Sequence, residues 1–156
     1  MMKKWMLMLL AACLLVWGLG GCGAASENTT QSQPQESAAA AGTERHITVS
    51  DGTNVVVFAL NDSDAANALW AQLPLTIAVE NYSSNEKIFY PDKLETSHTP
   101  AAQGQAGALA YYAPWGDVIM FYQGFRPSDK LYELGKAVSG QDNIQKLSGT
   151  LTITRD

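Results

Sequence analysis

The sequence GALAYYAPWGDVIMFYQGFRPSDKLYELG, residues 107–135, contains the densest group of aromatic side chains in the chain. Two runs within it, 109–112 and 118–122, are rich in β-branched and aromatic residues. Between these runs lies PWGD at 114–117, a combination that is typical of a tight turn. The stretch therefore predicts two paired strands, and a small β-barrel can close around such a hairpin.

A second hairpin is predicted at the start of the folded region. Residues 46–49 and 55–60 are short apolar runs that flank the sequence SDGT at 50–53, and Asp-Gly favours a hairpin turn. Because side chains alternate between the two faces of a strand, Ile47 and Val49 point to the same side.

One segment, residues 63–73, has a clear helical pattern. Asp62 or Ser63 can cap its start, and Pro74 stops it. Its apolar residues recur at helical spacing and form one face: Ala66, Leu69, Trp70 and Leu73. We therefore expect Trp70 to be a core anchor and the helix to plug or cover the barrel.

The rest of the chain alternates between short strands and polar loops. Strand patterns occupy 75–82, 88–90 and 150–155, and polar loops occupy 81–87, 92–106 and 123–130. Residues 131–138 fit either a helical turn or a strand, and 142–147 fit a short helix. One or two short helices among seven or eight short strands is a barrel pattern, since closure leaves no exposed sheet edge.

Residues 1–21 have the pattern of a lipoprotein signal peptide. Lys3 and Lys4 give a positive start, residues 5–17 are apolar, and small residues lead to Cys22. The apolar run is too short and too interrupted by glycine to be a good membrane span. Its end, LGGC at 19–22, resembles the bacterial lipobox, which implies that Cys22 is lipidated and becomes the mature N-terminus.

A competing lipobox-like sequence, LAAC at 10–13, is ranked lower. It would leave only 5–12 as the apolar segment and would keep the apolar residues 14–19 in the mature chain. An unmodified Cys22 after ordinary signal cleavage is the other alternative. Lipid chains contribute about 0.8 kcal/mol per buried CH₂, so several of them would hold the protein on the membrane firmly. The mature domain then has no thiol for a disulfide or a metal.

Residues 22–44 are predicted to be the lipidated cysteine followed by a disordered tether. After Cys22 this segment contains no aromatic or large aliphatic side chain, so it cannot bury enough apolar surface to offset its ordering entropy. The folded domain is then 45–156. Removal of the signal takes away two of the ten basic residues, which leaves eight against fifteen acidic residues and a net charge of −7. This balance argues against nucleic acid as a partner.

Several segments together resemble the small bacterial cyclophilin-like family. They are a first hairpin, a helix ending in LPL at 73–75, NEKI at 85–88, LAYYAPWGD at 109–117, FY at 121–122 and LG at 134–135. The resemblance covers nearly all of 45–156, and YYAPWG at 111–116 is its most specific part. It implies a mainly β domain, a closed cyclophilin-like β-barrel with one capping α-helix and one short helix.

The resemblance also raises the question of catalysis, because cyclophilins that are prolyl isomerases use an arginine beside a hydrophobic proline pocket. The sequence YQGFR at 122–126 contains some of the required residue types, but in a different order, and a shared fold does not transmit function. We therefore expect no catalytic residues. A prolyl isomerase of low activity, in which Arg126 polarises the carbonyl before proline, is the alternative.

The candidate ligand-binding residues are expected around the mouth of the barrel; they are Tyr90, Tyr112, Trp115, Tyr122, Phe125 and Arg126. Arg126 beside Phe125 either holds an anionic or carbonyl-bearing ligand or is a solvated loop residue. Trp115 is either an exposed contact or a packed turn anchor, and Asp117 is expected to cap the turn. Two histidines and no available cysteine argue against a metal site, and no cofactor motif is present.

Taken together, these patterns predict an extracytoplasmic lipoprotein on a bacterial cell membrane. Its domain is expected to be monomeric and non-catalytic, and to bind a peptide, a protein or a small ligand. A second alternative to this binding function is a role as accessory to a flavodoxin-type redox partner, which rests on the resemblance alone.

Overall fold

The structure is a computed structural model that describes residues 44–156, and these residues form a β-barrel domain. The predicted signal peptide, the lipidation site Cys22 and most of the predicted tether lie outside the described residues. The elements, in chain order, are β1 (Arg45–Ser50), β2 (Val55–Leu60), α1 (Asp64–Gln72), β3 (Leu75–Ala78), β4 (Glu80–Tyr82), β5 (Glu86–Phe89), β6 (Ala108–Tyr112), β7 (Asp117–Phe121), β8 (Leu131–Ser139), the 3₁₀ helix η1 (Gln141–Lys146) and β9 (Thr150–Arg155). No helix among them is long and apolar enough to cross a membrane.

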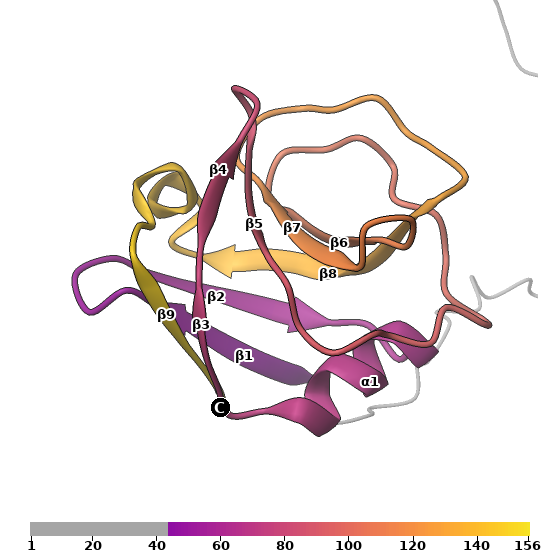
Figure 1. Cartoon of the computed structure of the whole chain (residues 1–156), viewed down its shortest axis with the longest axis horizontal. Helices are drawn as coiled ribbons and strands as arrows, with labels where there is room; N and C mark the ends of the chain where they lie inside the picture. Colours follow the sequence, from indigo (N-terminus) through magenta and orange to yellow (C-terminus); the bar gives the residue numbers. More distant parts are fainter. Residues whose placement is uncertain (1–43) are drawn as a thin grey trace, which may run out of the picture. The chain divides into compact units, whose positions relative to one another are not determined.

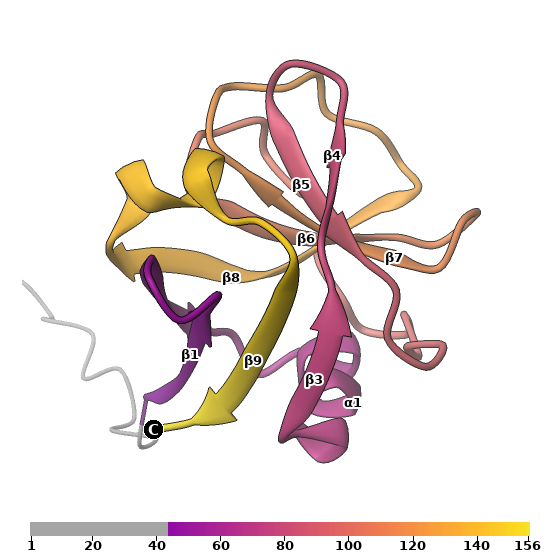
Figure 2. The same cartoon turned by 60° about the vertical axis from the view of Figure 1, so that its left-hand side comes forward.

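All nine strands belong to one antiparallel sheet in the order β3-β9-β1-β2-β8-β6-β7-β5-β4. The two end strands, β3 and β4, are consecutive in the chain and are separated only by Val79. Figures 1 and 2 show β3 running directly into β4, so the sheet curves round into a nearly closed barrel. The predicted β-barrel is confirmed.

The strand count is higher than predicted because residues 75–82 form two strands instead of one. The alternation expected there is present, since Leu75, Ile77 and Val79 are half-buried while Thr76 is exposed. However, β3 pairs with β9, whereas β4 pairs with β5. The backbone N–H of Val79 donates to Gly149 at 2.9 Å. The chain therefore changes partners at this residue.

The first hairpin, β1–β2, is formed as predicted, and one carboxylate holds its turn. Asp51 Oδ1 accepts hydrogen bonds from the backbone N–H groups of Thr53 and Asn54, at 2.9 and 2.7 Å. Its Oδ2 accepts from the backbone N–H of Ser148 at 3.1 Å. These bonds, first those from Asn54 and Thr53, lower the pKa of Asp51 to about 2.

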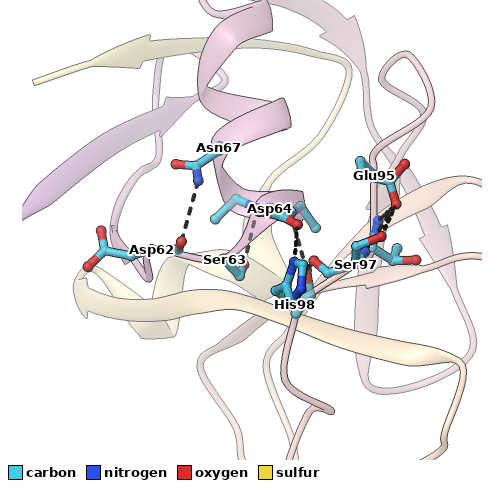
Figure 3. Close-up of polar contacts among 11 residues, drawn as sticks. Asp62, Ser63, Asp64, Asn67, Glu95, Ser97 and His98 are labelled. Carbon is cyan, nitrogen blue, oxygen red and sulfur yellow. Dashed lines mark hydrogen bonds and ion pairs between the residues drawn. The ribbon is translucent and has the colours of Figure 1, made fainter.

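Helix α1 is also formed as predicted, and its start is fixed by several polar contacts (Figure 3). The hydroxyl of Ser63 accepts from the backbone N–H of Ala66 at 3.3 Å, which is N-cap geometry. His98 Nδ1 lies 3.0 Å from Asp64 Oδ2, and Thr99 Oγ1 accepts from the backbone N–H of Ala65 at 3.1 Å. The 92–106 loop is thereby attached to the helix.

The helix packs its apolar face on the main core, where Ala66, Leu69 and Leu73 are buried. Trp70, expected as a core anchor, is half-buried beside this core. The guanidinium groups of Arg45 and Arg155 lie 5.6 and 5.1 Å from the centre of its ring. Two cation–π contacts therefore cover an indole that apolar packing leaves partly open.

The structure defines the segment that fitted either a helical turn or a strand and the segment predicted to be a short helix. Residues 131–138 lie within strand β8, and the short helix near 142–147 is η1, a 3₁₀ helix. Gly135 of β8 passes very close to β2, because a Cβ at this position would lie within van der Waals overlap of the Ala59 carbonyl. Only glycine fits between these two strands.

Candidate functional site

A pocket of about 360 Å³ lies on the domain, within the usual size range of small-molecule sites. Its lining residues come from β4, β5, β6, β7, the start of β8 and the loops beside them: Tyr82, Asn85, Glu86, Tyr112, Trp115, Asp117, Ile119, Phe121, Phe125, Arg126, Ser128 and Leu131. Figure 1 shows β6 and β7 side by side below two long loops, 92–106 and 122–130, with β5 running up beside them.

The pocket lies on the outer face of the sheet, whereas the sequence predicts a site at the mouth of the barrel. Side chains on β7 alternate, so Val118 and Met120 belong to the main core inside the barrel. Ile119 and Phe121 point the other way, into a second apolar cluster. That second cluster supplies the floor of the pocket, because Ile119 and Phe121 also line it.

One wall of the pocket is a group of three aromatic rings. The indole of Trp115 meets Tyr82 and Tyr112 edge to face, with centroid distances of 5.2 and 5.6 Å. Trp115 is 53% exposed although it makes these contacts. The turn before β7 therefore carries an aromatic contact that solvent can reach.

Another part of the pocket wall is formed by the 122–130 loop. The ring of Phe125 stacks on Phe121 with centroids 3.7 Å apart and 16° between the planes. The backbone N–H of Phe125 donates to Gly104 at 3.1 Å, and a Cβ on Gly104 would lie only 2.7 Å from the Phe125 carbonyl oxygen. The two long loops are therefore packed together, and Arg126 is held at the rim of the pocket.

Two acidic side chains in the pocket are buried, Glu86 with 8% and Asp117 with 1% of its surface exposed. Oδ1 of Asp117 has no hydrogen-bond partner among residues 44–156. Burial raises the pKa of Asp117, and its own backbone N–H opposes this in part. The pKa of Glu86 is also raised, first by burial and then by the charge of Asp117.

The strand register places these two carboxyl groups at different ends of the pocket floor. Glu86 of β5 is paired with Phe121 of β7, while Asp117 lies four residues before Phe121 on β7. At about 3.4 Å per residue this is a separation of roughly 13 Å along the strand, with Ile119 between them. They influence each other electrostatically, but they do not form a carboxyl pair that shares one proton.

Arg126 is the basic residue in the pocket lining, and its side chain is exposed. Within the described part of the chain it forms no ion pair with Glu86 or Asp117 at 4.0 Å or less. Across the same residues, no group of three or more His, Cys, Asp or Glu side chains is placed to hold a metal ion.

The structure brings four of the six predicted binding residues into the pocket lining: Tyr112, Trp115, Phe125 and Arg126. Tyr122 lies outside the lining, because it follows Phe121 on the opposite face and packs against the main core. Tyr90 is 46% exposed and also lies outside the lining. Its pKa is raised by desolvation and then by Asp117, so its hydroxyl lies within the electrostatic reach of the pocket.

The lining residues that the sequence did not predict include Tyr82, Glu86 and Asp117. The sequence predicts a polar loop at 81–87 and a turn cap at Asp117. Instead, the carbonyl of Tyr112 accepts the turn hydrogen bonds from Trp115 and Gly116, at 3.3 and 2.9 Å. Asp117 is the first residue of β7 and faces the pocket. The alternation of Asp117 with Ile119 and Phe121 was the available signal.

The fold and the site define a small antiparallel β-barrel with a pocket of ligand size on its outer face. The model of the cyclophilin-like family matches residues 47–155, and the chain belongs to this family. The solution structure of a hypothetical protein from Archaeoglobus fulgidus is similar, with a TM-score of 0.59 and 16% identity over 76% of this chain and 99% of that chain. At that identity the likeness shows the fold alone. No curated protein matches the sequence.

Proposed function

We propose that this protein is a membrane-anchored bacterial lipoprotein whose cyclophilin-like domain binds a peptide or a small ligand in the outer-face pocket. The observation that carries the proposal is a concave site of about 360 Å³ in which Trp115 is 53% exposed. Large apolar side chains left in solvent within a concave surface mark binding sites, since their burial by a ligand is favourable. Tyr82, also 45% exposed, contacts the same indole and would be covered with it.

The composition of the lining supports binding more than catalysis. Most of the surface is aromatic or aliphatic, and a small number of polar groups are placed to orient a ligand. Within the described residues, Oδ1 of Asp117 forms no hydrogen bond with a hydroxyl, thiol or imidazole that it could activate. The site therefore has polar groups for recognition without an arranged nucleophile and base.

The binding function is tested by calorimetric titration of the full chain, purified in detergent, with short blocked peptides. Binding should weaken about tenfold or more when Trp115 or Phe125 is changed to alanine, because each would lose an aromatic contact in the pocket. Val138→Ala is the control, since Val138 is 55% exposed and is not in the pocket lining. Equal affinities for all three variants would contradict a site at this pocket.

The membrane anchor is supported by the sequence pattern that ends at Cys22. Cys22→Ser should release the protein from the membrane fraction of cells, or should leave an unprocessed form with no acyl mass on its N-terminus. Cys13→Ser should leave lipidation unchanged. Loss of lipidation in the Cys13 variant, and not in the Cys22 variant, would assign the anchor to the other cysteine.

Prolyl isomerisation is the second candidate, because Arg126 lies in one pocket with the stacked Phe121 and Phe125 rings. An isomerase needs a donor for the carbonyl before proline and an apolar surface for the ring. NMR exchange on an X-Pro peptide tests it: accelerated exchange that Arg126→Ala abolishes would establish an isomerase and overturn the non-catalytic proposal. No feature of the described residues favours the flavodoxin-type partner.

A further inference from the structure

The pocket contains buried acidic side chains without buried basic partners, and this bears on the ligand that it takes. Asp117 is 1% exposed and belongs to the pocket lining, and its Oδ1 receives no hydrogen bond from any residue in 44–156. Glu86, also in the lining, forms no ion pair there either. A buried carboxylate without a partner is costly, so a donor supplied by a ligand would be strongly favoured.

Asp117 is held in place by the backbone. It is the first residue of β7 and is paired with Tyr112 on β6, in a strand whose five residues are all buried. A change in the conformation of a loop would therefore not bring this side chain into solvent. A group that enters the pocket can supply the missing hydrogen bond.

The surroundings of Asp117 favour a cationic group over an anionic one. Tyr82, Tyr112 and Trp115 line the same pocket, and the faces of aromatic rings attract cations. Arg126 is the positive residue in the lining, but its side chain is exposed on a loop, whereas Asp117 and Glu86 are buried. An anionic ligand would lie near one exposed guanidinium, that of Arg126, and near the two buried carboxyl groups of Glu86 and Asp117, so an anion is disfavoured.

We propose that the ligand of this pocket carries a protonated amino group, such as a lysine side chain, which Asp117 binds in the pocket that Tyr82, Tyr112 and Trp115 also line. The inference rests on the proposed binding function and specifies its ligand class. Glu86, at the far end of the floor, adds negative potential without direct contact. A lysine side chain also has a four-carbon stem, which the apolar floor at Ile119 and Phe121 accommodates.

The raised pKa values of Asp117 and Glu86 agree with this assignment, since a bound ammonium group would favour the charged form of both carboxyls. Binding should therefore release protons at a pH where these groups are partly protonated. The other titratable or charged groups in the lining are Tyr82, Tyr112 and Arg126, and Tyr90 interacts electrostatically with Asp117 from outside it. Glu80 acts on the same Tyr90.

The test compares three N-acetylated, C-amidated tripeptides that differ only in the middle residue: lysine, norleucine or glutamate. Norleucine keeps the four-carbon chain and removes the ammonium group. Calorimetric titration of the full chain in detergent should give an affinity for the lysine peptide about tenfold or more above that for the norleucine peptide. Asp117→Asn should bring this ratio close to one, and Glu86→Gln should reduce it partly.

Asp142→Asn is the control for net charge, because Asp142 is exposed on η1 and lies outside the pocket. It should keep the full lysine preference. A thermal melt shows whether Asp117→Asn folds. If it does not, Glu86→Gln and Trp115→Ala are used instead, and both should lower the ratio of the affinity for the lysine peptide to that for the norleucine peptide.

Equal affinities for lysine and norleucine would overturn the cationic ligand and leave the binding function standing. The tightest binding for glutamate would overturn it too, and would assign recognition to Arg126. If none of the three peptides binds, the cationic ligand and the binding of peptides fail together.

Discussion

The rings of Phe121 and Phe125 lie parallel, 3.7 Å apart, and this stack joins a buried strand of the barrel to the loop that borders the pocket. Phe121 is fixed in β7 with 2% exposure, whereas Phe125 is half-buried on the 122–130 loop. The position of Arg126, the next residue, therefore depends on this ring contact, on the backbone bond from Phe125 to Gly104 and on the bond from Asn85 Nδ2 to the Gly124 carbonyl.

Phe125→Ala should loosen this loop while leaving the barrel intact. The lost stacking and partial burial should lower the free energy of unfolding by about 1–2 kcal/mol. Urea unfolding measures this loss, and hydrogen exchange should rise in 122–130 but not in β7. Phe125→Leu retains apolar contact without the stack. Its free energy of unfolding should lie between those of the unmodified protein and the alanine variant. Unchanged exchange in the loop of the alanine variant would contradict an anchoring role.

Asp117→Asn should make the domain more stable at neutral pH. Because the folded pKa of Asp117 is raised above the ordinary 3.8, the unfolded chain loses its proton first as pH rises. The contribution of Asp117 to stability is thus highest below about pH 4 and falls as pH increases through the folded pKa. The free energy of unfolding falls by about 1.4 kcal/mol for each unit by which the folded pKa exceeds the unfolded pKa. Urea unfolding between pH 3 and 8 should show that the free energy of unfolding falls less with rising pH in the Asp117→Asn variant than in the unmodified protein. Asp142→Asn is the control and should behave like the unmodified protein.

Asp51→Ala should have the opposite pH dependence. Its folded pKa of about 2 lies below the ordinary 3.8, so its contribution is present above pH 4 and is lost as pH falls toward 2. The variant should be about 1 kcal/mol less stable at pH 7, a value that allows for screening near the surface. The difference from the unmodified protein should shrink on acidification in the same urea series. If the difference in free energy of unfolding stayed constant with pH, the charge of Asp51 would not contribute to the stability of the turn.

Gly135→Ala should destabilise the domain strongly. The added methyl group would overlap the Ala59 carbonyl, so β2 and β8 would have to separate, at a cost of about 2–4 kcal/mol. Gly124→Ala is a suitable control, since its nearest neighbour would be a Gly104 oxygen at 3.4 Å. Thermal denaturation should show a large loss for the first variant and a small change for the second. Similar melting of both would contradict the close approach of the strands.

Local patterns were sufficient to predict most elements of the fold. The turn residues around Asp51 and Gly116 and the apolar face of α1 act over a few neighbouring positions, so they can be recognised in the sequence. The division at Val79 was missed because it depends on two distant partners, β9 and β5. Residues 131–138 stayed ambiguous because the contact of Gly135 with Ala59 is also distant in sequence.

The candidate site was only partly predictable for a similar reason. Val118 and Met120 are as apolar as Ile119 and Phe121, so alternation separates the two faces of β7 without showing which one lies inside the barrel. Glu86 reaches the pocket through the pairing of β5 with β7. That pairing joins segments separated by the long 92–106 loop, and no local pattern indicates it.

The described domain contains two tryptophans in very different settings. Trp70 is half-buried in contact with two guanidinium groups at the helix, and Trp115 is 53% exposed in the wall of the pocket. An aqueous quencher such as acrylamide should therefore suppress the fluorescence of Trp115 well before that of Trp70. The domain thus has one optical reporter for the packing of its helix and a second for the occupation of its pocket, and the two signals can be followed in the same cuvette.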